Sequence, residues 1–121
     1  MEIKKVNLSE KLSTFTDHWS PKIIGELNNQ HVKVAKFKGN FTMHHHEHED
    51  ELFYVIGGEL FIELENKTLH LRTGEFVIIP KGMAHKPYAP EEVHVMLFEP
   101  ASTLNTGNIE NEKTQRALDR L

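Results

Sequence analysis

Short runs of alternating apolar and polar residues, separated by glycine, asparagine and proline, dominate the chain after Pro21. The clearest run is Glu59–Glu65, in which Leu60, Ile62 and Leu64 share one side, as in a strand with one buried face. The strands predicted in this way are Lys22–Leu27, His31–Lys38, Phe41–His46, Glu51–Ile56, Glu59–Glu65, a short run at Leu69 and Leu71, Phe76–Ile79, and Glu92–Glu99. Regularly spaced short strands of this kind are typical of an all-β sandwich or barrel.

Weak helical signals lie at both ends of the chain, outside the strand region. Asn7 is placed to cap a short helix, because Glu10 follows it by three residues. The apolar side of this helix would consist of Leu8, Leu12 and Phe15. Glu112–Leu121 predicts a second short helix, with an apolar side of Ala117, Leu118 and Leu121. We therefore expect short helical segments at the two termini of a β-structure.

The length of 121 residues fits a single domain, which we expect to span 1–121. Its core would lie at about 22–99, between an N-terminal arm at 1–21 and a C-terminal tail at 100–121. Hydrophobic residues make up 38% of the chain and charged residues 26%, which is compatible with a packed core. The formal net charge is -4, and no basic stretch is interleaved with aromatic residues, so we expect no nucleic-acid partner.

Two further features of composition narrow the chemistry and the location. Cysteine is absent, which excludes disulfides, thiolate nucleophiles and cysteine-ligated metals, so any metal must be held by nitrogen and oxygen. The longest apolar run, Leu52–Ile56, is far too short to cross a bilayer. No apolar segment of a secretory signal follows the charged N-terminus, and we expect a cytoplasmic protein with no membrane partner.

Histidine is the most informative residue type: the chain has nine, and four of them lie between His44 and His48. Because side chains alternate along a strand, His44 and His46 would point to one side and His45 to the other. Glu51 at the start of the next strand and His85 after a tight turn are candidates to complete a metal site. Three neutral imidazoles and one carboxylate suit a divalent ion such as Mn, Fe, Co, Ni, Cu or Zn. Alternation alone leaves a rival set open, namely His46, His48, Glu51 and His85.

Two spaced motifs resemble those of the cupin family. The first reads Gly39, four residues, His44-His45-His46, four residues, Glu51, six residues, Gly58. The second reads Gly74, five residues, Pro80-Lys81-Gly82, two residues, His85, three residues, Ala89. The family pattern has one more residue after the first glycine, and it ends on asparagine where this chain has Ala89; neither departure removes a ligand.

The resemblance implies a cupin β-barrel, also called a double-stranded β-helix of the jelly-roll type. It implies that one divalent transition metal ion is held by His44, His46, Glu51 and His85. The family spacing favours His44 over His48, which would then lie in a loop at the rim of the barrel. The four glycines Gly39, Gly58, Gly74 and Gly82 are expected in turns.

Function is less determined, because cupins host many chemistries. We expect a metalloenzyme acting on a small polar molecule, with isomerase, lyase or dioxygenase chemistry. Small cupins of this kind are often described as mannose-6-phosphate isomerase-like, but the sequence shows no glycine-rich phosphate loop or basic cluster. The alternatives are a module that binds a small ligand without turnover and a protein whose metal only braces the barrel. No catalytic residue can be named.

An apolar stripe suggests self-association. With Glu51 facing inward, Leu52, Tyr54 and Ile56 face outward, and a small barrel is not expected to leave such a stripe in water. A symmetric homodimer would cover it, and the alternative is that the ends of the chain itself do so.

Overall fold

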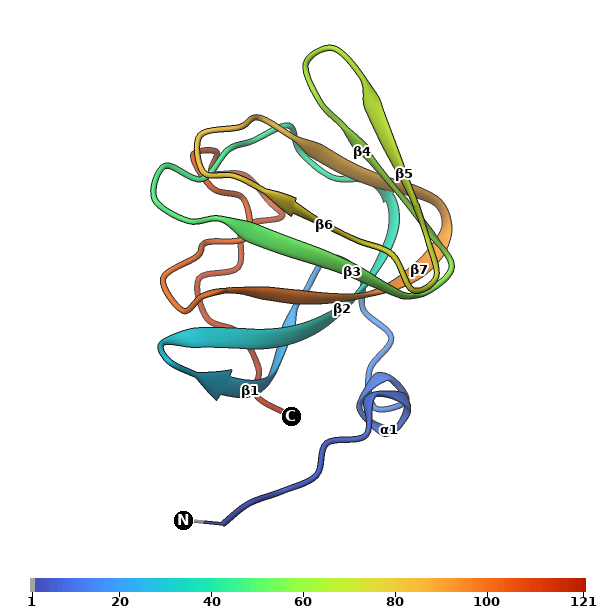
Figure 1. The fold of residues 1–121 in the computed structure, drawn as a ribbon, viewed down its shortest axis with the longest axis vertical. Coiled ribbons are helices and arrows are strands. Elements are labelled where there is room, and N and C mark those ends of the chain that lie inside the picture. Colours follow the sequence, from blue (N-terminus) through green and yellow to red (C-terminus); the bar gives the residue numbers. More distant parts are fainter. Residues whose placement is uncertain (1) are drawn as a thin grey trace.

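A computed structural model describes residues 2–121; Met1, the first residue of the predicted arm, lies outside the described residues (Figure 1). The elements are α1 (Leu8–Leu12), β1 (Lys22–Leu27), β2 (Gln30–Asn40), β3 (Glu51–Gly57), β4 (Glu59–Glu63), β5 (Thr68–Arg72), β6 (Phe76–Ile79) and β7 (Lys86–Pro100). All pairings between these strands are antiparallel. The all-β prediction is therefore confirmed, with one short helix in place of the two expected.

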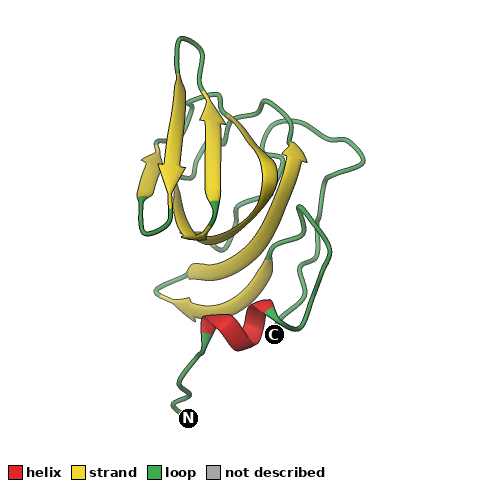
Figure 2. Ribbon diagram, turned by 90° about the vertical axis from the view of Figure 1, so that its right-hand side faces the viewer, coloured by secondary structure: helices red, strands yellow, loops and turns green. Residues whose placement is uncertain are grey.

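Strand β7 pairs with strands of both the large sheet and the β4–β5 hairpin. The large sheet has the strand order β1-β2-β7-β3-β6, while the β4–β5 hairpin attaches through the pairing of β4 with β7. Figure 2 shows the result, a strongly curved sheet with the hairpin closing over its concave side. Our prediction that the last strand begins at Glu92 was wrong. Strand β7 begins six residues earlier, at Lys86, and includes Pro87 and Pro90. Tertiary pairing with β4 holds the proline-containing segment extended.

The main core fills the concave side of the sheet. Its buried side chains come from alternate positions of six strands, β2 to β7, as the period of two in the sequence predicts. The residues are Ala35, Phe37, Phe53, Val55, Leu60, Ile62, Leu71, Ile79, Ala89, Val93, Val95 and Leu97. Gly58 turns the chain between β3 and β4 with φ 103°, and a Cβ there would lie 3.2 Å from the backbone of Val93, so only glycine fits.

The N-terminal segment packs against the convex side of the sheet. Asn7 caps α1 as predicted, because its Oδ1 accepts a hydrogen bond from the Glu10 N–H at 2.9 Å. Leu12 and Phe15 form a second small core with Ile24 and Val34 of β1 and β2. The predicted apolar face of the helix is confirmed by this packing.

Two predicted elements are wrong. Phe41–His46 is not a strand: within residues 2–121 it has a single β-bridge, between His44 and His85, although Phe41 N also donates a backbone hydrogen bond to the Pro87 carbonyl. The side chain of His44 instead bonds locally to the Thr42 carbonyl, which competes with a regular ladder.

The C-terminal helix predicted at Glu112–Leu121 does not form either. Asparagine side chains satisfy backbone groups there: Asn111 Oδ1 accepts from Lys113 N and Asn105 Oδ1 accepts from Gln115 N. The last residues run beside β1, where Leu121 N donates to the Ile23 carbonyl at 3.0 Å. A ten-residue segment with three apolar side chains has too little to bury for a helix to win over these contacts.

No helix within residues 2–121 has the length and apolar character needed to cross a bilayer. The cytoplasmic location and the division into arm, core and tail stay predictions.

Candidate metal centre

Three separate segments bring the four predicted ligands to one end of the curved sheet. His44 and His46 lie in the loop after β2, Glu51 is the first residue of β3, and His85 directly precedes β7. The bridge between His44 and His85 has two backbone hydrogen bonds, of 3.0 and 2.8 Å, and it fixes these two segments side by side. The pairing of Glu51 with Ile79 places the carboxylate at the inner edge of the same opening.

The four side chains converge on one point. One ligand atom from each of His44, His46, Glu51 and His85 lies within 4.8 Å of all the others, and all four residues are buried. The Oε1 atom of Glu51 lies 3.2 Å from His85 Nε2 and 3.3 Å from His46 Nε2. His44 and His46 point to the same side and His45 does not, as strand alternation predicts, although the segment is not a strand.

Backbone carbonyls orient two of the rings. His44 Nδ1 lies 2.7 Å from the Thr42 carbonyl, and His85 Nδ1 lies 2.9 Å from the Met83 carbonyl. A carbonyl can only accept, so each Nδ1 carries the proton and each Nε2 offers a lone pair. Metal-ligating histidines are held in this way by their second nitrogen.

The ligand atoms of the four residues leave lone pairs without hydrogen-bond donors, and a bound cation would supply the missing partner. His46 Nε2 is buried and has no hydrogen-bond partner among residues 2–121, although Glu51 lies close to it. His85 Nε2 and Glu51 Oε1 face each other as two acceptors at 3.2 Å once Nδ1 carries the proton. A divalent ion would satisfy all of these lone pairs together.

Electrostatics also favour the forms that bind metal. Burial disfavours the charged imidazolium of His44 and, together with the neighbouring His85, lowers its pKa to about 4. Burial opposes the ionisation of Glu51, but when His46 or His85 directs a proton toward Glu51, that contact outweighs burial and holds the pKa of this carboxyl well below its usual range. At neutral pH the cluster therefore contains a neutral His44 and an ionised Glu51.

The other candidate residues lie outside this cluster. His48 is exposed, so the structure does not bring the rival set together. His45 faces Glu47 at 2.8 Å. Of the remaining acidic residues in the turn, Asp50 accepts a hydrogen bond from Lys81 N and Glu49 accepts one from Ser102 Oγ.

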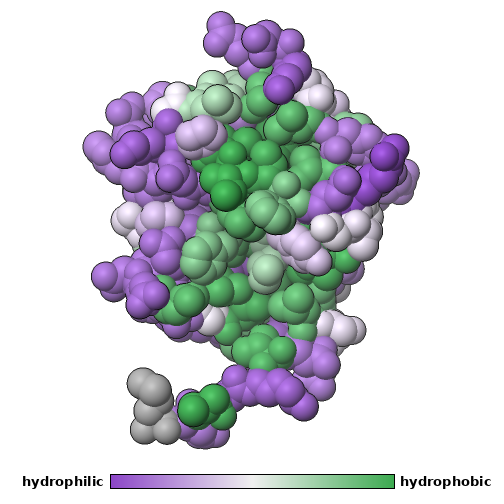
Figure 3. All heavy atoms as spheres, in the orientation of Figure 1, coloured by the Kyte–Doolittle hydropathy of each residue, from purple (hydrophilic) through white to green (hydrophobic). Residues whose placement is uncertain are grey.

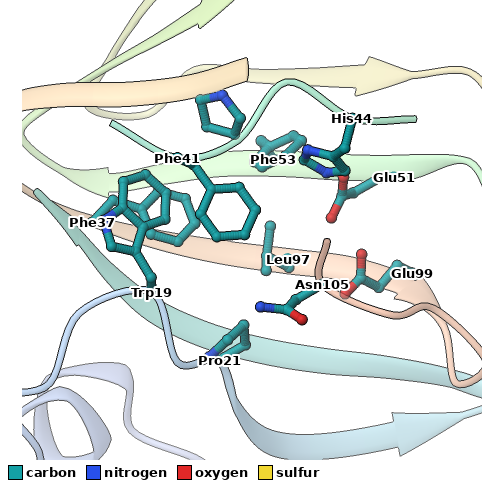
Figure 4. Close-up of a pocket in the computed structure, with 11 residues that line it drawn as sticks. Trp19, Pro21, Phe37, Phe41, His44, Glu51, Phe53, Leu97, Glu99 and Asn105 are labelled. Atoms are coloured by element: carbon teal, nitrogen blue, oxygen red, sulfur yellow. The ribbon is translucent and has the colours of Figure 1, made fainter. Parts of the chain in front are cut away.

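A pocket of about 360 Å³, part of it open to solvent, lies directly beside the cluster. Its lining includes His44 and Glu51 at one end and the rings of Trp19, Phe37 and Phe41 at the other (Figure 4). The neighbouring walls are Phe53 and Leu97 from the sheet, Pro21, Pro87, Glu99 and Asn105. The four buried ligand residues thus have a partly open pocket beside them.

A buried ion pair, which the sequence analysis missed, forms part of this region. Lys33 Nζ lies 2.7 Å from Glu99 Oε1, and each side chain is only 2% exposed. Burial and the negative charge of Glu51 hold the pKa of Glu99 well above its usual range, and Lys33 opposes this effect. The signal was present in the pattern, because Glu99 follows Val93, Val95 and Leu97 on the inward side of β7.

The C-terminal tail closes the pocket from the side. Asn108 pairs with the backbone of His45 through two hydrogen bonds, of 2.8 and 3.0 Å. Gly107 lies so close beneath this loop that a Cβ would meet the His45 carbonyl oxygen at 2.1 Å. The tail is therefore a wall of the site, which the sequence analysis did not anticipate.

A family model described as the cupin domain matches residues 30–99, more than half of the chain. The chain is a cupin. Among curated proteins, an uncharacterized protein of Bacillus subtilis is 42% identical to it over 64 residues, which are 52% of this chain and 57% of that protein. A 3-hydroxyanthranilate 3,4-dioxygenase of Xenopus laevis is 25% identical over 101 residues, which are 78% of this chain but only 36% of the enzyme. The chain thus spans little more than half, or about a third, of these relatives.

Solved structures agree on the fold. A cupin-2 domain protein from Shewanella frigidimarina has 42% sequence identity and a TM-score of 0.78, with 78% of this chain and 93% of that chain covered. Hydroquinone 1,2-dioxygenase from Sphingomonas has a TM-score of 0.75 at 16% identity, with 84% of this cupin and 33% of the enzyme covered. The second likeness shows the fold alone.

Proposed function

We propose that this cupin binds one divalent transition metal ion through His44, His46, Glu51 and His85 and uses it to act on a small molecule. The observation that carries this proposal is the convergence of four buried ligand atoms beside an open pocket. Three imidazoles and one carboxylate leave coordination positions of an octahedral ion free, which suits chemistry better than a closed structural site.

The chemistry supplied by such an ion is Lewis acidity or, for iron, reaction with dioxygen. The similarity to a Xenopus dioxygenase favours oxygen chemistry over isomerase or lyase chemistry. The residues of this chain hold the site: the carbonyls of Thr42 and Met83 orient His44 and His85, and the tail and the aromatic rings form part of the pocket wall. The predicted small polar molecule would enter by the pocket, where its polar end would meet Glu51 and Glu99.

Metal content per chain tests the ligand assignment. His44→Ala, His46→Ala and His85→Ala are each expected to lose most of the metal, because each removes a lone pair from the converging set. His48→Ala is the matched control and is expected to keep it, since that side chain is exposed. Elemental analysis of protein purified without added metal measures both, and it also names the ion. Loss in the His48 variant with retention in the His44 variant would contradict the assignment.

The second candidate function, ligand binding without turnover, shares the same site. The open pocket beside the candidate metal centre favours both alternatives equally. An experiment separates the enzyme from the binding protein. A small molecule that binds the metal-loaded protein is added in air, and the consumption of the molecule and of oxygen is measured. Turnover supports the enzyme, whereas an unchanged ligand supports a binding protein.

We further propose that the cupin is a homodimer through the convex side of β3 and β6. Phe76 and Ile78 are 60% and 54% exposed there, and they pair with Tyr54 and Leu52 of the predicted stripe. Figure 3 shows an apolar patch on this face of the molecule. Ile56, by contrast, packs against the small core of the N-terminal segment, so the chain covers part of the stripe itself.

Phe76→Asp is expected to convert the dimer to a monomer, because it places a charge on the exposed apolar side of β6. Ile3→Asp is the matched control: Ile3 is 95% exposed and lies in the N-terminal segment. Light scattering at micromolar concentration measures the mass of each. A monomeric wild-type protein would mean that this face does not self-associate.

A further inference from the structure

One side of the pocket beside the candidate metal centre is a stack of aromatic rings. The Trp19 ring stacks on Phe37 with centroids 4.2 Å apart and planes 13° apart, and on Phe41 at 4.8 Å and 22° (Figure 4). Trp19 has φ 60°, a conformation that a bulky residue adopts only when its surroundings impose it. Two hydrogen bonds of 2.9 Å do so, from Trp19 N to the Lys36 carbonyl and from its indole N–H to the Lys38 carbonyl.

The opposite end of the pocket is polar and acidic. The carboxyl groups of Glu51 and Glu99 face each other there (Figure 4). Glu99 is 2% exposed, and its Oε2 atom has no hydrogen-bond partner among residues 2–121. Asn105 lines the same end but has both amide atoms engaged, with the Lys113 carbonyl and with Gln115 N. The free polar atom of the pocket is thus a carboxyl oxygen, which calls for a polar hydrogen-bonding group on the ligand.

We propose that this pocket binds a single flat aromatic ring that carries a hydroxyl or amino group, with the ring against Phe41 and Trp19 and the donor toward Glu99. The inference rests on the proposed function, since it names the substrate class of the same site. Offset-stacked aromatic surfaces favour a flat ring over a puckered one. The described lining contains no lysine or arginine, so a sugar phosphate would find no protein cation there.

Binding of phenol tests the proposal on the full chain, first with chelator and then with added manganese. Trp19 is the one tryptophan of the chain, so its fluorescence reports this pocket, and ligand-observed NMR gives a second readout. Cyclohexanol keeps the hydroxyl without the flat ring, and toluene keeps the ring without the donor. We expect both to bind about tenfold more weakly than phenol, and a hexose phosphate not to bind the chelated protein.

Phe41→Ala is expected to weaken phenol binding about tenfold, through loss of stacking and of buried area. Phe61→Ala is the matched control, because Phe61 is equally half-buried but stacks on His70 and Tyr88 away from the pocket. Phe41→Leu keeps the apolar bulk and removes only the ring, so it serves if the alanine variant does not fold. Equal binding of phenol by the Phe41 and Phe61 variants, or equal binding of phenol and cyclohexanol, overturns the proposal.

The two metal conditions separate this inference from the proposed function. Phenol binding to a protein that takes up no metal supports the aromatic pocket and overturns only the metal-dependent function. Metal uptake without phenol binding in either condition overturns the aromatic pocket alone.

Discussion

Glu99→Leu is expected to lower the free energy of unfolding by about 3 kcal/mol. The reason is that Lys33 is 2% exposed and has Glu99 as its partner at 2.7 Å, so leucine would leave an ammonium group buried without a partner. Burying an unpaired charge is among the costliest single changes, since water no longer solvates it. Urea unfolding with chelator present measures the effect free of any metal contribution.

Two further variants make this expectation specific. Glu91→Leu removes an exposed glutamate from the same strand and is expected to change stability by less than about 0.5 kcal/mol. The double variant Lys33→Met/Glu99→Leu replaces the pair by apolar side chains and is expected to recover most of the loss. If Glu99→Leu costs no more than Glu91→Leu, the ion pair does not stabilise the fold.

The sequence predicted those parts of the fold that follow from local alternation and turn chemistry. The run around Leu60 and Ile62 forms β4 with those residues buried, and Asn7 caps α1. The errors occur where partners distant in sequence decide. The segment at Lys86 is extended because β4 pairs with it, and the tail is irregular because it lies against β1 and His45.

The residues of the candidate site also fall into those that the sequence predicted and those that it did not. The resemblance to the two cupin motifs implied His44, His46, Glu51 and His85, whereas strand alternation alone left the set with His48 open. The pocket could not be predicted, since Trp19 and Asn105 come from the two ends of the chain and meet the sheet only in three dimensions. Glu99 and Lys33 were overlooked although both lie at inward positions of their strands. A charged residue at such a position is expected to have a partner of opposite charge.

Acidification from about pH 8 to about pH 5 is expected to destabilise the metal-free protein by about 2 kcal/mol through His44 alone. Unfolded His44 takes up a proton near its ordinary pKa of 6.5, whereas burial keeps it neutral in the folded chain until its pKa of about 4. The unfolded state therefore binds more protons between these values, and stability falls as the pH falls. His44→Asn is expected to lack this component, while His70→Asn, which removes an exposed imidazole, retains it.

Bound metal should make this dependence steeper, because protons and metal compete for the same imidazole nitrogens. Metal that binds only the folded state adds about 2.7 kcal/mol at a free concentration of about 100 times its dissociation constant. Chelator should therefore lower the melting temperature markedly at about pH 8 and by less at lower pH, where protons compete with the ion for the ligand nitrogens. Glu51 does not limit binding in this range, since its contacts with His46 and His85 hold its pKa well below the usual value. Coinciding melting curves with and without chelator at about pH 8 would mean that no stabilising metal occupies the site, and the proposed function would fail with it.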